Sequence, residues 1–167
     1  MIVPDYVEPI VAWRMWYAVD TGLSASLTSI VHRAYWPRGA PLVATCHRMR
    51  NAVWPFSRSK HDAPAAGCRC GIYAGRLEGL RPYLPDCYVA DMEVPVIGRV
   101  LLWGIVHEHE FGWRAAQAYP ETLYVPSVSP TTEQLVRHLG AYGVPVKPLF
   151  ASSADELLDA VGRKIAA

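Results

Sequence analysis

The residues that could do chemistry gather between Cys46 and Ala74, which holds three of the four cysteines and two of the six histidines. Cys46, His61, Cys68 and Cys70 follow the pattern C-x14-H-x6-C-x-C. Three thiolates and one imidazole are a ligand set that suits tetrahedral zinc. The sequence therefore predicts a structural zinc site formed by these four residues.

The C-x-C pair leaves other interpretations open, because well-attested zinc sites usually carry C-x2-C pairs. Free cysteine is among the most buried residue types, so simple core packing is a second interpretation. A Cys68–Cys70 disulfide is a third, although so short a ring would be strained. His47 and Cys87 are rival ligands. The turn-forming run 61–68 favours metal binding, because it has few bulky apolar groups and a bound metal would order it.

Two strings in the chain carry a resemblance. HDAPAAGCRCGIYA at 61–74 is followed by GRVLLWGIVHEHEFGWRAAQAYPETL at 98–123. Together they resemble a group of uncharacterised, chiefly actinobacterial proteins in which an H-x-A-P-x3-C-x-C-G-I-Y-A string precedes a G-x-V-x-L-W-G-x-V-x-E-H-E-x-G-x-R-A string. The likeness covers roughly residues 10–125. It supports the grouping of these residues and implies no activity.

The tetrad His107-Glu108-His109-Glu110 is a second cluster of polar, titratable side chains. On a strand the two histidines point to one side and the two glutamates to the other, so all four cannot surround one metal. A histidine pair on one face could still bind a metal or act as acid and base. The alternative function is therefore a small metal-dependent enzyme that uses His107, Glu108 and His109.

Enzyme motifs are missing from the sequence. It contains no H-E-x-x-H helix motif, no zinc-deaminase pattern, no phosphate-binding glycine loop and no G-x-S-x-G. We therefore expect the tetrad to be a strand end that reaches the surface. No catalytic residue is assigned.

Positive charge is concentrated in one part of the chain. No acidic residue occurs between Thr21 and His61, and the basic residues there alternate with aromatic ones. Basic groups can hold a nucleic-acid backbone while bases stack on aromatic rings. The other interpretation is a solvated basic loop with its aromatic rings facing the core. The candidate nucleic-acid-binding residues are Arg48, Arg50, Arg58, Lys60 and Trp54.

The composition indicates one domain that can bury a sizeable core, with 167 residues, 51% of them hydrophobic and 19% charged. The net charge of +1 does not by itself indicate a partner. No apolar run approaches the roughly 18 residues of a transmembrane helix, and Met1–Ile10 lacks the basic start of a secretory signal. We expect a cytoplasmic protein without a membrane partner, in which thiols stay reduced.

The elements that must position these residues are mostly strands. Val7–Val19 reads as a strand with its odd positions buried, and Asp20–Gly22 as a hairpin turn. Gly98–His109 is apolar on both faces over 100–106, which predicts a central strand, and Gly104 within it suggests a bulge, a bend or a close approach by another backbone. Further expected strands are Leu23–Ile30, Pro41–Cys46, Gly71–Gly75 (or a short helix) and Trp113–Tyr119, the last with Pro120 ending the regular pairing.

Two helices are predicted near the C-terminus. The first follows a cap at Ser129 or Thr131 and buries Leu135, Val136, Leu139 and Tyr142; the second is capped by Ser152–Ser153 and buries Leu157, Leu158, Val161 and Ile165. The expected fold is α+β: an antiparallel, barrel-like sheet with a Cys/His-bearing loop at 46–74 and two C-terminal helices. Residues 1–128 form the β-rich domain, and 129–167 a helical extension packed on it.

The sequence therefore predicts a non-enzymatic binding or accessory module with a structural, zinc-like clip. Its expected partner is nucleic acid or another protein, with nucleic acid favoured because of the basic and aromatic residues.

Overall fold

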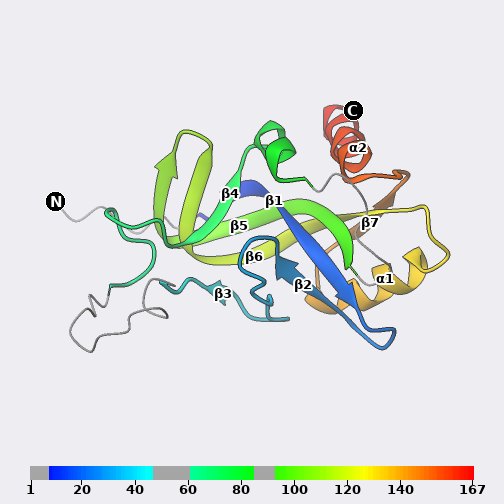
Figure 1. Cartoon of the computed structure of the whole chain (residues 1–167), viewed down its shortest axis with the longest axis horizontal. Coiled ribbons are helices and arrows are strands. Elements are labelled where there is room, and N and C mark those ends of the chain that lie inside the picture. The colour runs from blue at the N-terminus through cyan, green and yellow to red at the C-terminus, as the bar shows by residue number, and fades with distance from the viewer. Residues whose placement is uncertain (1–7, 47–60, 85–92) are drawn as a thin grey trace.

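A computed structural model describes residues 8–46, 61–84 and 93–167, and they form a mixed α+β fold (Figure 1). The predicted α+β class is confirmed. Seven strands form one sheet: β1 Ile10–Asp20, β2 Ala25–Ser29, β3 Leu42–Val43, β4 Ile72–Gly75, β5 Glu93–His109, β6 Gly112–Pro126 and β7 Val146–Leu149. The helices are the 3-10 turn η2 Leu77–Tyr83, α1 Thr132–Leu139, the 3-10 turn η3 Gly140–Tyr142 and α2 Ala154–Ala166.

The hairpin of β5 and β6 is the centre of the sheet. Strand β5 pairs with β1 and β6, and β4 also pairs with β1 and β6, so hydrogen bonds run in a ring through β1, β4, β6 and β5. Strand β2 adds to β1, and β3 adds to β6. The predicted central position of the 98–109 strand is therefore confirmed.

The sheet is not antiparallel throughout, because β7 runs parallel to β6. Helix α1 and turn η3 lie between these strands in the chain, and a crossover of this kind is what joins neighbouring parallel strands. The expectation of an antiparallel sheet is wrong at this edge.

Two irregularities shape the β5–β6 hairpin. Gly104 has φ +75°, and the pairing shifts register between Trp103 and Val106, which confirms the bulge interpretation. Pro120 interrupts the regular pairing, as predicted, but it does not end the strand. Pro120 lies opposite Val100, the register shifts there, and pairing continues as far as Tyr124 opposite Ile97. The local shift accommodates a residue that has no N–H to donate.

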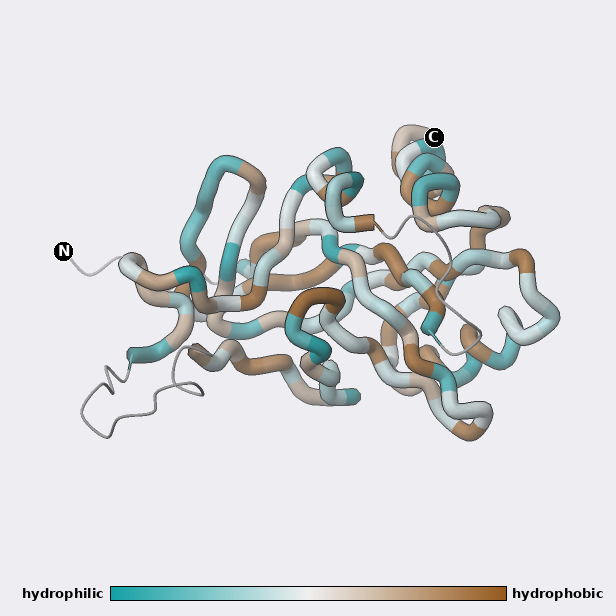
Figure 2. Tube along the Cα trace, in the orientation of Figure 1, coloured by the Kyte–Doolittle hydropathy of each residue, from teal (hydrophilic) through white to brown (hydrophobic). Residues whose placement is uncertain are grey.

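Strand β1 buries residues on both of its faces. Even positions Ala12, Trp16 and Ala18 join the larger core cluster with Leu135 and Leu139 of α1. On the odd face, Met15 joins a second cluster formed with α2 and η2, whereas Val11 is 45% exposed. The prediction of a single buried odd face is therefore wrong, because helices cover the sheet on two sides (Figure 1). Figure 2 shows the hydrophobic positions concentrated along the strands between them.

The C-terminal helices begin close to where the sequence places them. The Ser153 side chain accepts a hydrogen bond from the Glu156 N–H at 3.1 Å, and Glu156 in turn accepts from the N–H and hydroxyl of Ser152. These contacts form the predicted cap of α2. Ile165, predicted to be buried, is 50% exposed, and the buried positions of α2 end at Val161.

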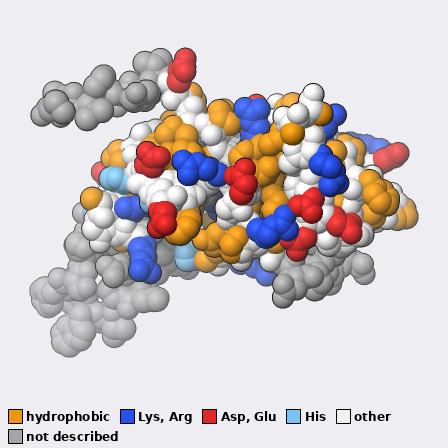
Figure 3. Space-filling model, turned by 90° about the horizontal axis from the view of Figure 1, so that it is seen from above, with side chains coloured by type: hydrophobic (Ala, Val, Ile, Leu, Met, Phe, Trp, Pro, Cys, Tyr) orange, Lys and Arg blue, Asp and Glu red, His pale blue; other side chains and the backbone are white. Residues whose placement is uncertain are grey.

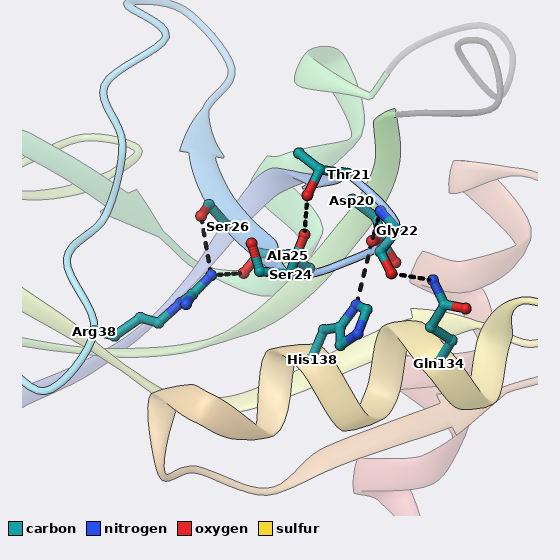
Figure 4. Close-up of polar contacts among 9 residues, drawn as sticks. All are labelled: Asp20, Thr21, Gly22, Ser24, Ala25, Ser26, Arg38, Gln134 and His138. Carbon is teal, nitrogen blue, oxygen red and sulfur yellow. Dashed lines mark hydrogen bonds and ion pairs between the residues drawn. The ribbon is translucent and has the colours of Figure 1, made fainter.

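Helix α1 docks on the predicted turn between β1 and β2 (Figure 4). Asp20 accepts from the Gly22 N–H at 2.8 Å, and Gly22 has φ +83°. His138 Nδ1 lies 3.2 Å from Asp20 Oδ1, and the Gln134 amide donates to the Gly22 carbonyl at 3.4 Å. These contacts tie the C-terminal segment to the first hairpin.

Candidate metal centre

Strand β6 brings the two parts of the Cys/His cluster together. Cys46 follows β3, and His61, Cys68 and Cys70 precede β4. Both strands pair with neighbouring parts of β6, since the Ala44 N–H donates to the Ala116 carbonyl at 2.8 Å and Ile72 lies opposite Ala115. The register on β6 therefore determines how closely Cys46 approaches the C-x-C pair.

The ligand atoms of Cys46, His61, Cys68 and Cys70 all lie within 4.8 Å of one another, close enough to hold a metal ion. The Sγ atoms of Cys46 and Cys68 are 3.7 Å apart, and His61 Nε2 is 3.3 Å from Cys70 Sγ. A tetrahedron with Zn–S bonds of about 2.3 Å has S···S edges of about 3.8 Å and N···S edges of about 3.6 Å. The two measured distances are close to these edges.

The three cysteines are free thiols, which argues against the disulfide interpretation for Cys68 and Cys70. All four candidate ligands are half-buried, so they are not core packing residues either. Two of the earlier alternatives therefore disagree with the geometry. The rival ligands His47 and Cys87 lie outside the described residues.

Hydrogen bonds from the backbone favour the thiolate form of Cys68. The N–H of Cys70 donates to the Cys68 sulfur and is the main reason that the pKa of Cys68 falls to about 6. Burial raises the pKa of Cys70, which also faces the neighbouring thiols. A thiolate is the form that binds a metal. Cys68 would therefore be largely deprotonated at neutral pH before a metal binds.

The loop that carries the ligands packs tightly on the sheet. Ala63 and Pro64 are buried, and the Cys68 N–H donates to the Ala65 carbonyl at 3.0 Å. Gly71 has φ +128°, and a Cβ there would lie 3.1 Å from Pro64 Cβ and 3.2 Å from Arg114 Cβ. The chain can turn from Cys70 into β4 here because residue 71 has no side chain.

The tetrad His107–Glu110 is not part of a candidate metal site. Among the described residues, the group of His, Cys, Asp and Glu side chains able to hold a metal is the Cys46 cluster, which excludes these histidines. The ring of His109 packs against Tyr73 with centroids 5.6 Å apart, and its Nδ1 accepts from the Phe111 N–H at 3.3 Å. Glu108 is exposed. This arrangement gives the enzyme alternative no support.

The predicted nucleic-acid contacts Arg48, Arg50, Arg58, Lys60 and Trp54 lie outside the described residues, so they stay predictions. Two basic residues earlier in the same stretch bind within the protein. Arg33 pairs with Glu93 and lies over the ring of Tyr17, and Arg38 donates to the Ala25 carbonyl at 2.6 Å (Figure 4).

The two neighbouring aromatic residues, Tyr35 and Trp36, differ in exposure. Trp36 is buried in the core, and Tyr35 is 65% exposed. On the face drawn in Figure 3, acidic and basic side chains are interspersed. The internal contacts of Arg33 and Arg38 and the burial of Trp36 fit a structural role for the described part of the basic stretch, whereas the exposed Tyr35 does not.

Two residues beside the cluster were not assigned to the site from the sequence. Arg114 and Tyr73 donate hydrogen bonds to the backbone between Cys68 and Cys70. Both are fixed positions of the two strings that carry the resemblance, Tyr73 in the first and Arg114 in the second, but that signal indicates no role for either residue.

Comparison of the chain with protein-family models, with curated protein sequences and with solved structures gave no match. Across the described residues, neither α-helix is long and apolar enough to cross a membrane.

Proposed function

We propose that this chain is a metal-binding module in which Cys46, His61, Cys68 and Cys70 hold a structural zinc ion. The observation that carries the proposal is the mutual approach of the four ligand atoms within 4.8 Å. Four protein ligands complete a tetrahedral shell, so no coordination position remains for water or substrate. This ligand count favours a structural role over catalysis.

The chemistry of the donor set supports zinc. Magnesium and calcium prefer oxygen ligands, whereas three thiolates and one imidazole suit soft or borderline ions. Zinc prefers tetrahedral geometry with these donors and has no redox chemistry of its own. In this role the ion joins the segment after β3 to the segment before β4. Both strands pair with β6.

Purified protein is expected to contain one zinc ion per chain. The ion should leave only with strong chelation or unfolding, because binding free energy at a structural site is also folding free energy. Elemental analysis of protein grown without added metal measures the content. Cobalt substitution should give the absorption of tetrahedral thiolate coordination. Freshly purified protein without metal, and with no cobalt thiolate band after reconstitution, would contradict the proposal.

A second proposal concerns the segment 47–60, which lies between two of the ligands, Cys46 and His61. The ion would hold both ends of this segment at one point. The segment contains four Lys or Arg residues and two aromatic residues and lacks acidic ones. Single-stranded nucleic acid is the partner that this composition favours.

Replacing Arg48, Arg50 and Arg58 together by alanine is expected to weaken binding to a single-stranded oligonucleotide. The dependence of log K on log salt should also flatten, since each phosphate contact contributes a slope of roughly 0.7 on single strands. Fluorescence anisotropy over a salt series measures both quantities. The matched control replaces Arg137 and Arg163 of the C-terminal helices, which should leave binding unchanged. If the wild-type protein binds no oligonucleotide at low salt, this second proposal fails and a protein partner is favoured.

A further inference from the structure

Side chains from the sheet bind each of the three carbonyl groups in the Cys68–Arg69–Cys70 segment. Arg114 Nη1 donates to the Cys68 carbonyl and to the Cys70 carbonyl, the latter at 3.0 Å. Tyr73 Oη donates to the Arg69 carbonyl at 2.7 Å. The backbone of the C-x-C pair is therefore held on its carbonyl side, and its thiols remain available to a metal.

The two donors stand next to each other on a regular part of the sheet. Tyr73 on β4 lies directly opposite Arg114 on β6, and Arg114 lies opposite His107 on β5. Residues directly opposite in antiparallel strands present their side chains on the same face. Both side chains therefore lie against the loop. Gly71 packs so closely on Arg114 that there is little space between the loop and β6.

The hydrogen bond from Tyr73 holds the middle peptide group of the C-x-C segment. Its hydroxyl binds the Arg69 carbonyl, which lies between the two carbonyls that Arg114 binds. Loss of the hydroxyl would loosen the orientation of the loop.

Arg114 also supplies charge. A zinc ion with three thiolates and a neutral imidazole carries a net negative charge. The half-buried Arg114 guanidinium binds the backbone of two of the three cysteine ligands, so its positive charge lies close to that centre. Opposite charge at this range stabilises the metal-loaded site.

We infer that Arg114 and Tyr73 are positioning residues of the metal site, which hold the backbone of the C-x-C pair so that its thiols face the metal. The inference rests on the proposed metal-binding function. Outer contacts of this kind are typically worth 10–100-fold in metal affinity.

The test measures zinc affinity by competition with a chelator and records the absorption spectrum of the cobalt form. We expect Arg114→Gln to weaken zinc binding by about 10–100-fold, and Tyr73→Phe to weaken it by about 10-fold, with altered cobalt bands in both. Arg114→Lys should recover part of the affinity, because it restores the charge without the forked donor. The matched controls are Arg99→Gln, a half-buried arginine on β5 that pairs with Glu121 away from the loop, and Tyr35→Phe, an exposed tyrosine.

The inference is overturned if both variants bind zinc with wild-type affinity and show the wild-type cobalt spectrum. A merely structural role for the pair would lower thermal stability, and the apparent zinc affinity with it, but would leave the cobalt spectrum of the folded protein unchanged, and this outcome also overturns the inference. If Arg114→Gln does not fold, Tyr73→Phe decides the outcome, because it removes a single hydroxyl. The failure of the proposed function is distinct from these results, since the wild-type chain itself would then bind no metal.

Discussion

Replacing Cys68 by serine is expected to release the metal and to lower the free energy of unfolding by several kcal/mol. Cys68 lies 3.7 Å from Cys46 across the site, so it joins the two parts of the chain that the ion connects. A serine hydroxyl stays protonated and is a poor zinc ligand, and three ligands hold the ion weakly. Because metal binding and folding are coupled, the protein loses both together. Zinc content by elemental analysis and urea unfolding measure the two effects.

The control for this experiment is Cys87→Ser, which changes a rival thiol in the same way. It should keep one equivalent of zinc and nearly wild-type stability. Chelation of the wild-type protein should reproduce the stability loss of Cys68→Ser. Chelation of the Cys68→Ser variant should change its free energy of unfolding little. Full zinc content in Cys68→Ser would show that this thiol is not a ligand.

Replacing Trp16 by alanine is expected to lower the free energy of unfolding by about 3–5 kcal/mol. Trp16 is fully buried on β1 and meets Trp36 edge-on, with ring centroids 5.3 Å apart. Gly98 on the neighbouring strand has no side chain, and a Cβ there would lie 3.1 Å from the Trp16 ring. The backbone around the ring is restrained by strand pairing on both sides of β5, so the cavity would not close.

Urea unfolding in the presence of saturating zinc measures this loss, so that metal binding does not vary between samples. The control is Phe150→Ala, which removes an aromatic ring that is 83% exposed and should change stability by about 0.5 kcal/mol or less. A loss for Trp16→Ala no greater than that for Phe150→Ala would contradict the assignment of Trp16 to the core.

The sequence by itself determined the features that depend on local chemistry. Gly104 predicted an irregularity in its strand, Asp20–Gly22 a turn and Ser152–Ser153 a helix cap, and the structure has all three. Each follows from backbone conformation or from side chains within a few residues. The quartet of Cys46, His61, Cys68 and Cys70 was also readable as a group, because ligand type is a property of the residues.

The tertiary structure decided the features that depend on contacts between residues far apart in the sequence. The burial of both faces of β1 depends on helices more than a hundred residues later, and the parallel pairing of β7 depends on the crossover through α1. Pairing past Pro120 depends on a register shift that β5 permits. No local sequence pattern in β1, β6 or β7 predicts these contacts.

The metal site shows the same division. Residue type named the four ligands, but only the register of β3 and β4 on β6 places Cys46 near Cys68 and sets Arg114 beside Tyr73 under the C-x-C carbonyls. The physical reason is that side-chain period along a strand is local, whereas the alignment of one strand against another depends on hydrogen bonds and packing across the whole sheet.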